Sequence, residues 1–158
     1  MKVRDVMAPN PFTLPPTASV AAAAIALAES KIGGCPVVDA SGRVVGVLDE
    51  ANILDALKTQ HKELKVLMPA EISFGISFVE IVRTKEAVSA FSDVGDWPIE
   101  RVMTKEVVSV SPDDGIEAAI QLMVKHRIHR VPVIEGGKLV GIVTRTDILR
   151  GFFRTVET

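Results

Sequence analysis

Four polar residues follow directly on a short apolar run near the end of the chain, and their types suit a charged, hydroxylated ligand. The run is Val140-Gly141-Ile142-Val143, and Thr144, Arg145, Thr146 and Asp147 come next. The β-branched run predicts a buried strand, and Thr144 or Thr146 suits the N-cap of a following helix. A helix N-terminus attracts phosphate, and a carboxylate accepts the hydroxyls of a ribose. The residues therefore indicate a nucleotide site, although plain helix capping explains the same spacing.

Composition restricts the class of protein. The 158 residues are 47% hydrophobic and 24% charged, which predicts a globular chain long enough to bury a core. The formal charge of -2 argues against nucleic-acid binding. Cys35 is the single cysteine, which excludes an internal disulfide and suits a reducing compartment. The apolar stretch 20–28 is too short to span a membrane, so we expect a cytoplasmic protein.

The chain contains an internal repeat. Val6-Met7 recurs as Val102-Met103 and Pro36-Val37 recurs as Pro132-Val133, each at a shift of 96 residues (102 − 6 and 132 − 36). The shift then falls to 95, because the turn after the second of these strands is one residue shorter in the second copy. We therefore expect a first repeat at residues 1–57, a helical linker at 58–96, and a second repeat with a C-terminal helix at 97–158.

Each copy predicts the element order β-α-β-β-α. The expected first strands are Phe12 to Leu14 and Val107 to Val110, and the expected hairpin turns are Ser41-Gly42 and Gly136-Gly137. The first helix of each copy is expected to run from a cap at Ser19 to Ser30, and from a cap at Asp113 or Asp114 to His126. The apolar face predicted for the second of these helices comprises Ile116, Ala119, Ile120, Met123 and Val124. One copy has too little core to fold alone, so we predict an α/β (α+β) fold of two pseudo-symmetric repeats packed sheet to sheet.

These signatures resemble a tandem pair of cystathionine-β-synthase domains, known as a CBS pair or Bateman module. The resemblance rests on the repeated Val-Met leader, on the strands Cys35-Pro36-Val37-Val38 and Val131-Pro132-Val133-Ile134, and on Gly-apolar-apolar-Thr-x-x-Asp in the second copy. It implies regulatory binding of AMP, ADP, ATP or S-adenosylmethionine in a cleft between the repeats, with no cofactor required. It also implies assembly into homodimers.

The resemblance assigns roles to second-repeat residues. It places Asp147 on the ribose hydroxyls, with Thr144 and Thr146 near ribose and phosphate. Arg145 offers charge-assisted bonds to phosphate, and His129 or Arg130 is expected to reach the same group. The adenine base would lie against the backbone of Val131, Pro132 and Val133.

The first repeat departs from this arrangement. Asp49 and Asn52 align with Thr144 and Asp147, so an acid replaces a hydroxyl and an amide replaces the ribose acid. Asp49 repels phosphate, and an amide is a poorer partner for ribose than a carboxylate. We therefore expect one good site and a weaker or empty one, the latter formed by Cys35, Pro36, Val37, Asp49 and Asn52.

The sequence favours a non-catalytic sensor that signals to a separate effector protein or to a second copy of the chain. No catalytic motif and no metal-ligand spacing is recognisable, although Asp147 and Asp49 are conceivable as an acid/base pair. The main alternative is a structural dimerisation or interaction module whose ligand site has decayed. We expect no membrane association.

Overall fold

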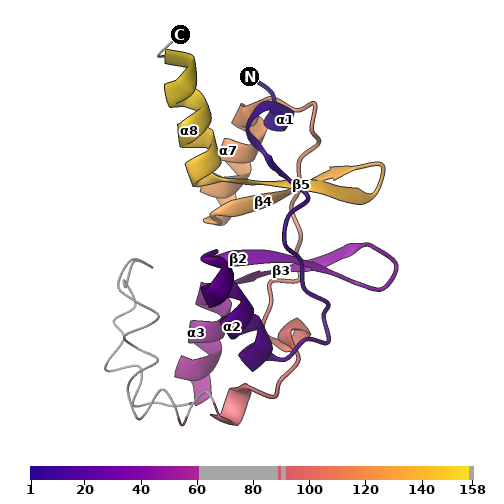
Figure 1. Cartoon of the computed structure of the whole chain (residues 1–158), viewed down its shortest axis with the longest axis vertical. Coiled ribbons are helices and arrows are strands. Elements are labelled where there is room, and N and C mark those ends of the chain that lie inside the picture. Colours follow the sequence, from indigo (N-terminus) through magenta and orange to yellow (C-terminus); the bar gives the residue numbers. More distant parts are fainter. Residues whose placement is uncertain (61–88, 90–91, 157–158) are drawn as a thin grey trace. The chain divides into compact units, whose positions relative to one another are not determined.

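The computed structural model describes residues 1–60, 89 and 92–156. It contains both helices and antiparallel strands, which confirms the α+β class (Figure 1). Much of the predicted linker, 58–96, lies outside the described residues. The helices are α1 (Val3–Val6), α2 (Val20–Ser30), α3 (Glu50–Gln60), the 3-10 helix η1 (Ile99–Arg101), α7 (Ile116–His126) and α8 (Arg145–Val156). The strands are β1 (Ala8–Pro9), β2 (Gly34–Val38), β3 (Val44–Asp49), β4 (Arg130–Glu135) and β5 (Lys138–Thr144).

The chain folds into two compact units that cut across the sequence repeats. One contains Met1–Thr13, Val38–Val45 and Glu106–Thr158, and the other contains Leu14–Val37 and Gly46–Lys105. The first repeat therefore sends its leader, the residues that precede its main body, into the unit built mainly from the second repeat. The second repeat's leader, residues 97–105, in turn belongs with the body of the first.

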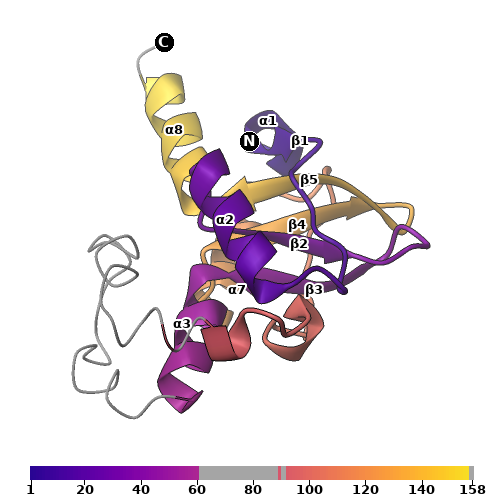
Figure 2. The same cartoon turned by 60° about the horizontal axis from the view of Figure 1, so that its bottom comes forward.

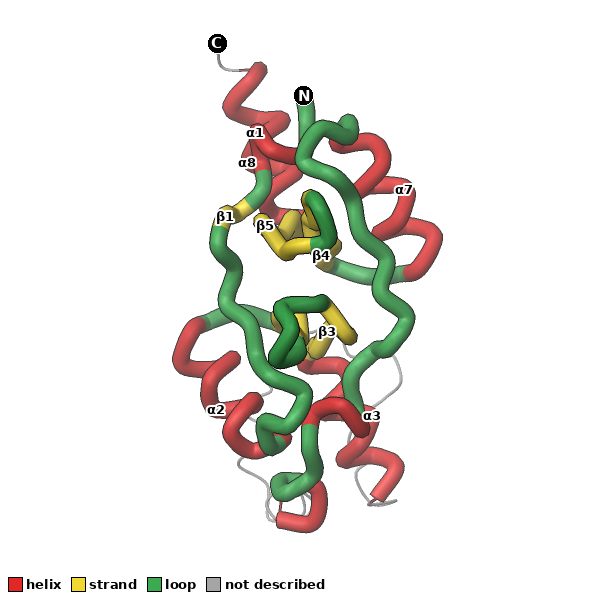
Figure 3. Tube along the Cα trace, turned by 90° about the vertical axis from the view of Figure 1, so that its right-hand side faces the viewer, coloured by secondary structure: helices red, strands yellow, loops and turns green. Residues whose placement is uncertain are grey.

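The unit built on the second repeat has a three-stranded antiparallel sheet in the order β1-β5-β4. In it β1 lies along β5, with Ala8 opposite Ile142, and α1 lies beside α8 (Figure 3). The helices α7 and α8 contact β4 and β5 respectively. The core of this unit comprises Val3, Val110, Ala119, Met123, Val131, Val133, Val143 and Ile148. Val3 comes from the exchanged leader, so the leader is part of the core.

The other unit is built on the hairpin of β2 and β3. Helices α2 and α3 lie side by side in it (Figure 2). The second repeat's leader, residues 97–105, attaches to this unit through two backbone hydrogen bonds. Val20 N donates to the Trp97 carbonyl at 2.8 Å, and Ile99 N donates to the Ala18 carbonyl at 2.8 Å. The Arg101 guanidinium stacks over the Trp97 ring, 3.6 Å from its centroid. Its fully buried side chains include Val20, Leu27, Leu48, Ile53, Leu57, Val94 and Ile99.

Several local predictions are confirmed. Ser19 caps α2 and accepts a hydrogen bond from Ala22 N at 3.1 Å, and the helix ends at Ser30 as expected. Both hairpin turns use glycine at positive φ, +85° at Gly42 and +58° and +78° at Gly136 and Gly137. Few other residues adopt these angles without strain.

Three predictions about the second helix and the first strands are wrong. The N-cap of α7 is Gly115, not Asp113 or Asp114, because both aspartates bond to other groups. Val124 is 74% exposed and does not belong to the buried face of α7. The strands expected at 12–14 and 107–110 reduce to single parallel bridges, Leu14 to Val37 and Val110 to Val133.

A glycine in each closing strand allows the exchanged leader to approach closely. A Cβ at Gly141 would meet the Met7 sulfur at 2.6 Å and the Ala8 carbonyl oxygen at 3.0 Å. At the equivalent Gly46, an added Cβ would meet atoms of the Met103 side chain. Methionine can rotate away from such a contact, whereas a backbone carbonyl within a strand cannot. A side chain at position 141 is therefore harder to accommodate than one at position 46.

We predict that Gly141→Ala destabilises the protein more than Gly46→Ala does. Overpacking against the leader backbone should cost about 1–3 kcal/mol at Gly141, and the flexible Met103 should relieve most of the cost at Gly46. Urea unfolding of both variants and the wild type measures the difference. Equal midpoints for the two variants would contradict the close approach of Ala8.

Candidate functional site

The polar residues after β5 form a reciprocal cap at the start of α8. Thr144 Oγ1 accepts a hydrogen bond from Asp147 N at 3.2 Å, and Asp147 Oδ2 accepts from Thr144 N at 2.9 Å and from Thr144 Oγ1 at 2.8 Å. Thr144 is thus the capping residue, while Thr146 and Arg145 are exposed on the first turn. Helix capping therefore accounts for one carboxylate oxygen of Asp147, Oδ2.

The second carboxylate oxygen of Asp147 lies outside the cap. Asp147 Oδ1 accepts from Arg150 Nη1 at 3.4 Å. The Asp147 side chain is only 13% exposed, whereas that of Arg150 is 56% exposed. Asp147 therefore presents an acceptor that the cap positions, beside an exposed cation.

The hairpin brings two further predicted residues to the same end of the sheet. Arg130 lies opposite Thr144 in the β4–β5 register. The Arg145 N–H donates to the His129 carbonyl at 3.2 Å. His129, Arg130, Thr144 and Arg145 therefore gather where β4 begins and β5 ends, although the Arg145 amide is already bonded and is not available to a phosphate.

The three residues predicted to flank a base are buried. Val131, Pro132 and Val133 in β4 lie within the sheet, so a ligand would reach only their backbone. The Pro132 carbonyl already accepts from Val110 N at 3.1 Å.

The first repeat has a related cap at the start of α3, formed by different side chains. Asn52 Oδ1 accepts from Asp49 N at 2.8 Å, and Asp49 Oδ1 accepts from Ala51 N at 3.0 Å. The Glu50 N–H donates to the Gly33 carbonyl at 2.9 Å, as Arg145 does to His129. The amide nitrogen of Asn52 donates to Thr104 Oγ1 at 3.4 Å. Cys35, Pro36 and Val37 are buried in β2.

A pocket of about 650 Å³ adjoins Asp147. Asp147, Arg150 and Arg154 of α8 form one wall, and the leader residues Met7 and Ala8 form part of the other. This volume is in the usual range for small-molecule sites. Sequence reasoning found Asp147 but not the rest of the pocket. The spacing of residues 147, 150 and 154 places them on one helix face, which is a recognisable signal, whereas nothing in the sequence shows that the leader covers that face.

Comparison with known proteins gives the family. The sequence profile of the CBS domain matches the chain twice, at residues 3–59 and 98–154. The chain belongs to the CBS domain family. The resemblance inferred from the repeats is thereby confirmed.

Several known proteins and solved structures are similar along most of the chain. The protein MJ1426 of Methanocaldococcus jannaschii is 31% identical over 123 residues, which cover 77% of this chain and 73% of that protein. A crystal structure of CBSX2 in complex with AMP superposes with a TM-score of 0.70 at 25% identity, over 98% of each chain. The CBS pair of MJ0100 in complex with 5'-methylthioadenosine and S-adenosyl-L-methionine gives a TM-score of 0.71 at 25% identity, also over 98% of each chain.

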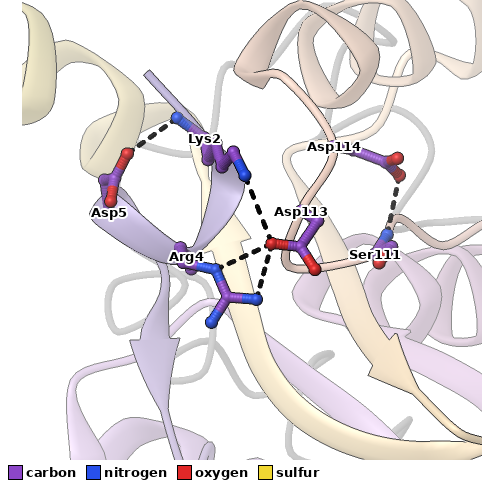
Figure 4. A network of polar contacts seen from close by, with 6 residues as sticks. All are labelled: Lys2, Arg4, Asp5, Ser111, Asp113 and Asp114. Atoms are coloured by element: carbon purple, nitrogen blue, oxygen red, sulfur yellow. Dashed lines mark hydrogen bonds and ion pairs between the residues drawn. The ribbon is translucent and has the colours of Figure 1, made fainter.

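A polar network fixes the leader of this CBS pair (Figure 4). Asp113 Oδ1 accepts from Arg4 Nη2 at 2.7 Å, from Arg4 Nε at 3.1 Å and from Lys2 Nζ at 3.5 Å. Backbone bonds from Val3 N to the Asp114 carbonyl at 2.9 Å reinforce the attachment. The hydrogen bond and charge of Arg4 lower the pKa of Asp113 below its usual value, and Asp113 raises the pKa of Arg4.

Two classes of feature are not found in the described parts of the chain. Residues 1–60, 89 and 92–156 contain no cluster of three histidine, cysteine or acidic side chains that could hold a metal ion. Within the same ranges, no helix has the length and apolar character needed to cross a membrane.

We predict that the Asp113 network contributes stability only above acidic pH. The folded-state pKa of Asp113 lies below its unfolded value of 3.8, so its stabilising effect is complete above that value and is lost as the pH falls through the folded pKa. All three side chains are exposed, so the effect should be small and sensitive to salt. The melting temperature of Asp113→Asn should be slightly below that of the wild type at pH 7, and the difference should shrink as the pH falls below 3.8. A difference that stays constant on acidification would assign the effect to another cause.

Proposed function

We propose that this CBS pair is a non-catalytic regulatory module that binds an adenosine-containing ligand, AMP, ADP, ATP or S-adenosylmethionine, mainly through its second repeat. Ligand binding in the similar structures of CBSX2 and MJ0100 supports the ligand class. The first-repeat site, around Asp49 and Asn52, is weak or empty in this proposal.

The observation that carries the proposal is the position of Asp147 Oδ1. This oxygen lies outside the helix cap, and its residue is largely shielded from solvent and lines a pocket of about 650 Å³. A ribose diol would donate to this oxygen and displace or share the Arg150 contact. Arg150 and Arg154 are the cations that line the pocket. The other predicted residues do not line it and lie at the end of the hairpin. There, Arg145, Thr146, His129 or Arg130 would bind a phosphate or carboxylate group that extends beyond the pocket, with the backbone of Val131, Pro132 and Val133 nearest the base.

Regulation requires that the ligand bind one state of the module better than another. The exchanged leaders offer a physical basis, because a ligand beside Asp147 contacts residues of both sequence repeats at once. The output would pass to a separate effector protein or to the second subunit of a homodimer, in the cytoplasm. No cofactor is needed for this role.

A structural module with a decayed site is the second candidate, and the first repeat favours it locally. There the amide of Asn52 is already bonded to Thr104. An enzymatic role has less support, because Asp147 and Asp49, the acid pair considered from the sequence, are both engaged in helix caps.

The proposal is tested by calorimetric titration of ligand-free protein with AMP, ATP and S-adenosylmethionine in turn. We expect about one equivalent of one ligand per chain. Asp147→Asn should weaken it at least tenfold, since a charge-assisted hydrogen bond contributes about 1.5–3 kcal/mol. Asparagine is a better substitution than alanine because it removes the charge and can keep the cap, as Asn52 does in the first repeat.

Asn52→Ala is the matched control. It removes the acceptor of the Asp49 N–H from the other repeat and should leave the ligand affinity unchanged. Absence of binding by the wild type, together with a melting temperature that no ligand shifts, would favour the structural module, since a ligand that binds the native state stabilises it.

A further inference from the structure

The two leaders place one residue each at equivalent positions beside the closing helices. Ala8 lies opposite Ile142 of β5, and Thr104 lies opposite Val47 of β3, to which it is joined by two backbone hydrogen bonds of 3.0 Å. Each follows a methionine that packs over the glycine of the closing strand, as described above. The backbone frame is therefore the same in both units, and the side chain is what differs.

The difference falls beside the residue that corresponds to the ribose acid. In the first repeat, Thr104 Oγ1 lies 3.4 Å from the amide nitrogen of Asn52 and occupies the space next to it. In the second, Ala8 has only a methyl group, and it lines the pocket together with Asp147. The Thr104 hydroxyl occupies this position beside Asn52, whereas the corresponding position beside Asp147 is open to the pocket.

We propose that the leader residue at this position decides which repeat accepts a ligand: Ala8 keeps the site beside Asp147 open, and Thr104 closes the site beside Asn52. This inference rests on the proposed function and adds two specificity-determining residues to it, neither of which belongs to the strand-helix motif.

A threonine in place of Ala8 would act in two ways. Its extra atoms would occupy the pocket, and its hydroxyl would donate to Asp147 Oδ1, the oxygen proposed to receive the ribose hydroxyls. The ligand would then have to displace a charge-assisted hydrogen bond. Arg150 and Arg154 on the same wall favour an anionic ligand, so AMP is a better probe than adenosine.

The experiment compares AMP affinity in the wild type, Ala8→Thr, Ala8→Gly and Thr104→Ala. Ala8→Thr should weaken AMP binding at least tenfold. Ala8→Gly leaves the pocket open and should stay within about threefold of the wild type. Thr104→Ala removes the hydroxyl beside Asn52 and should let the other unit bind AMP as well, so that more than one equivalent binds per chain. An unchanged stoichiometry in folded Thr104→Ala would show that Thr104 does not close the site beside Asn52. Melting temperatures of the ligand-free variants show whether each is folded. Ala8→Ser, which adds only the hydroxyl, replaces Ala8→Thr if the threonine variant fails to fold and should also weaken AMP binding.

The outcomes separate this inference from the proposed function. If the wild type binds AMP, Asp147→Asn loses it, and folded Ala8→Thr binds as the wild type does, the role of Ala8 is wrong and the proposed function stands. If the wild type binds no adenosine ligand, both are wrong. Selective loss in Ala8→Thr, or in Ala8→Ser, with retention in Ala8→Gly supports both.

Discussion

The close approach of an exchanged leader to the closing strand is the constraint on which the site depends. Gly141 permits Met7 and Ala8 to lie directly over β5, and Val3 then reaches the core of the second-repeat unit. The network around Asp113 holds the same segment from outside. Without this packing the pocket beside Asp147 would lose one wall, because Met7 and Ala8 come from the other sequence repeat. The candidate site is thus a property of the pair of repeats and not of either repeat alone.

Asp147 caps α8, but this structural role does not require a charged side chain. The cap at the start of α8 needs an acceptor for the Thr144 N–H, and Asn52 supplies the same acceptor in the first repeat without a charge. Asparagine and aspartate are comparable in caps, and a negative charge near a helix N-terminus adds about 0.3–1 kcal/mol. The cap also fixes the carboxylate, so its second oxygen is presented in one orientation. A fixed acceptor loses little entropy when a ligand binds, which is the advantage of building a site on a capping residue.

The repeat, the α+β class and the Ser19 cap were predictable from the sequence, and the cap of α8 was narrowed to Thr144 or Thr146, because these features depend on local chemistry and on spacing within the chain. The predicted N-cap of α7 was wrong, because Asp113 binds Arg4 of the leader and Asp114 accepts from Ser111 N, so Gly115 stands at the cap position. Sequence reasoning also missed the pairing of β1 with β5. A two-residue strand such as Ala8–Pro9 has no periodicity, and its partner is far away in the chain. The helix side of the candidate site was therefore predictable from the sequence, and the leader side was not.

The asymmetry between the repeats determines what kind of response the proposed module gives. A chain with two equal sites has the means for cooperative binding within one molecule, whereas a chain with one site gives a simple saturation curve. With Thr104 against Asn52 in one unit and Ala8 beside Asp147 in the other, a single chain would respond gradually to its ligand. Any steeper response would have to come from coupling between copies of the chain. A ligand shifts the equilibrium between two conformational states only as far as it binds one of them more tightly than the other. The leader lines the pocket, so a change in its position would alter the ligand contacts most directly.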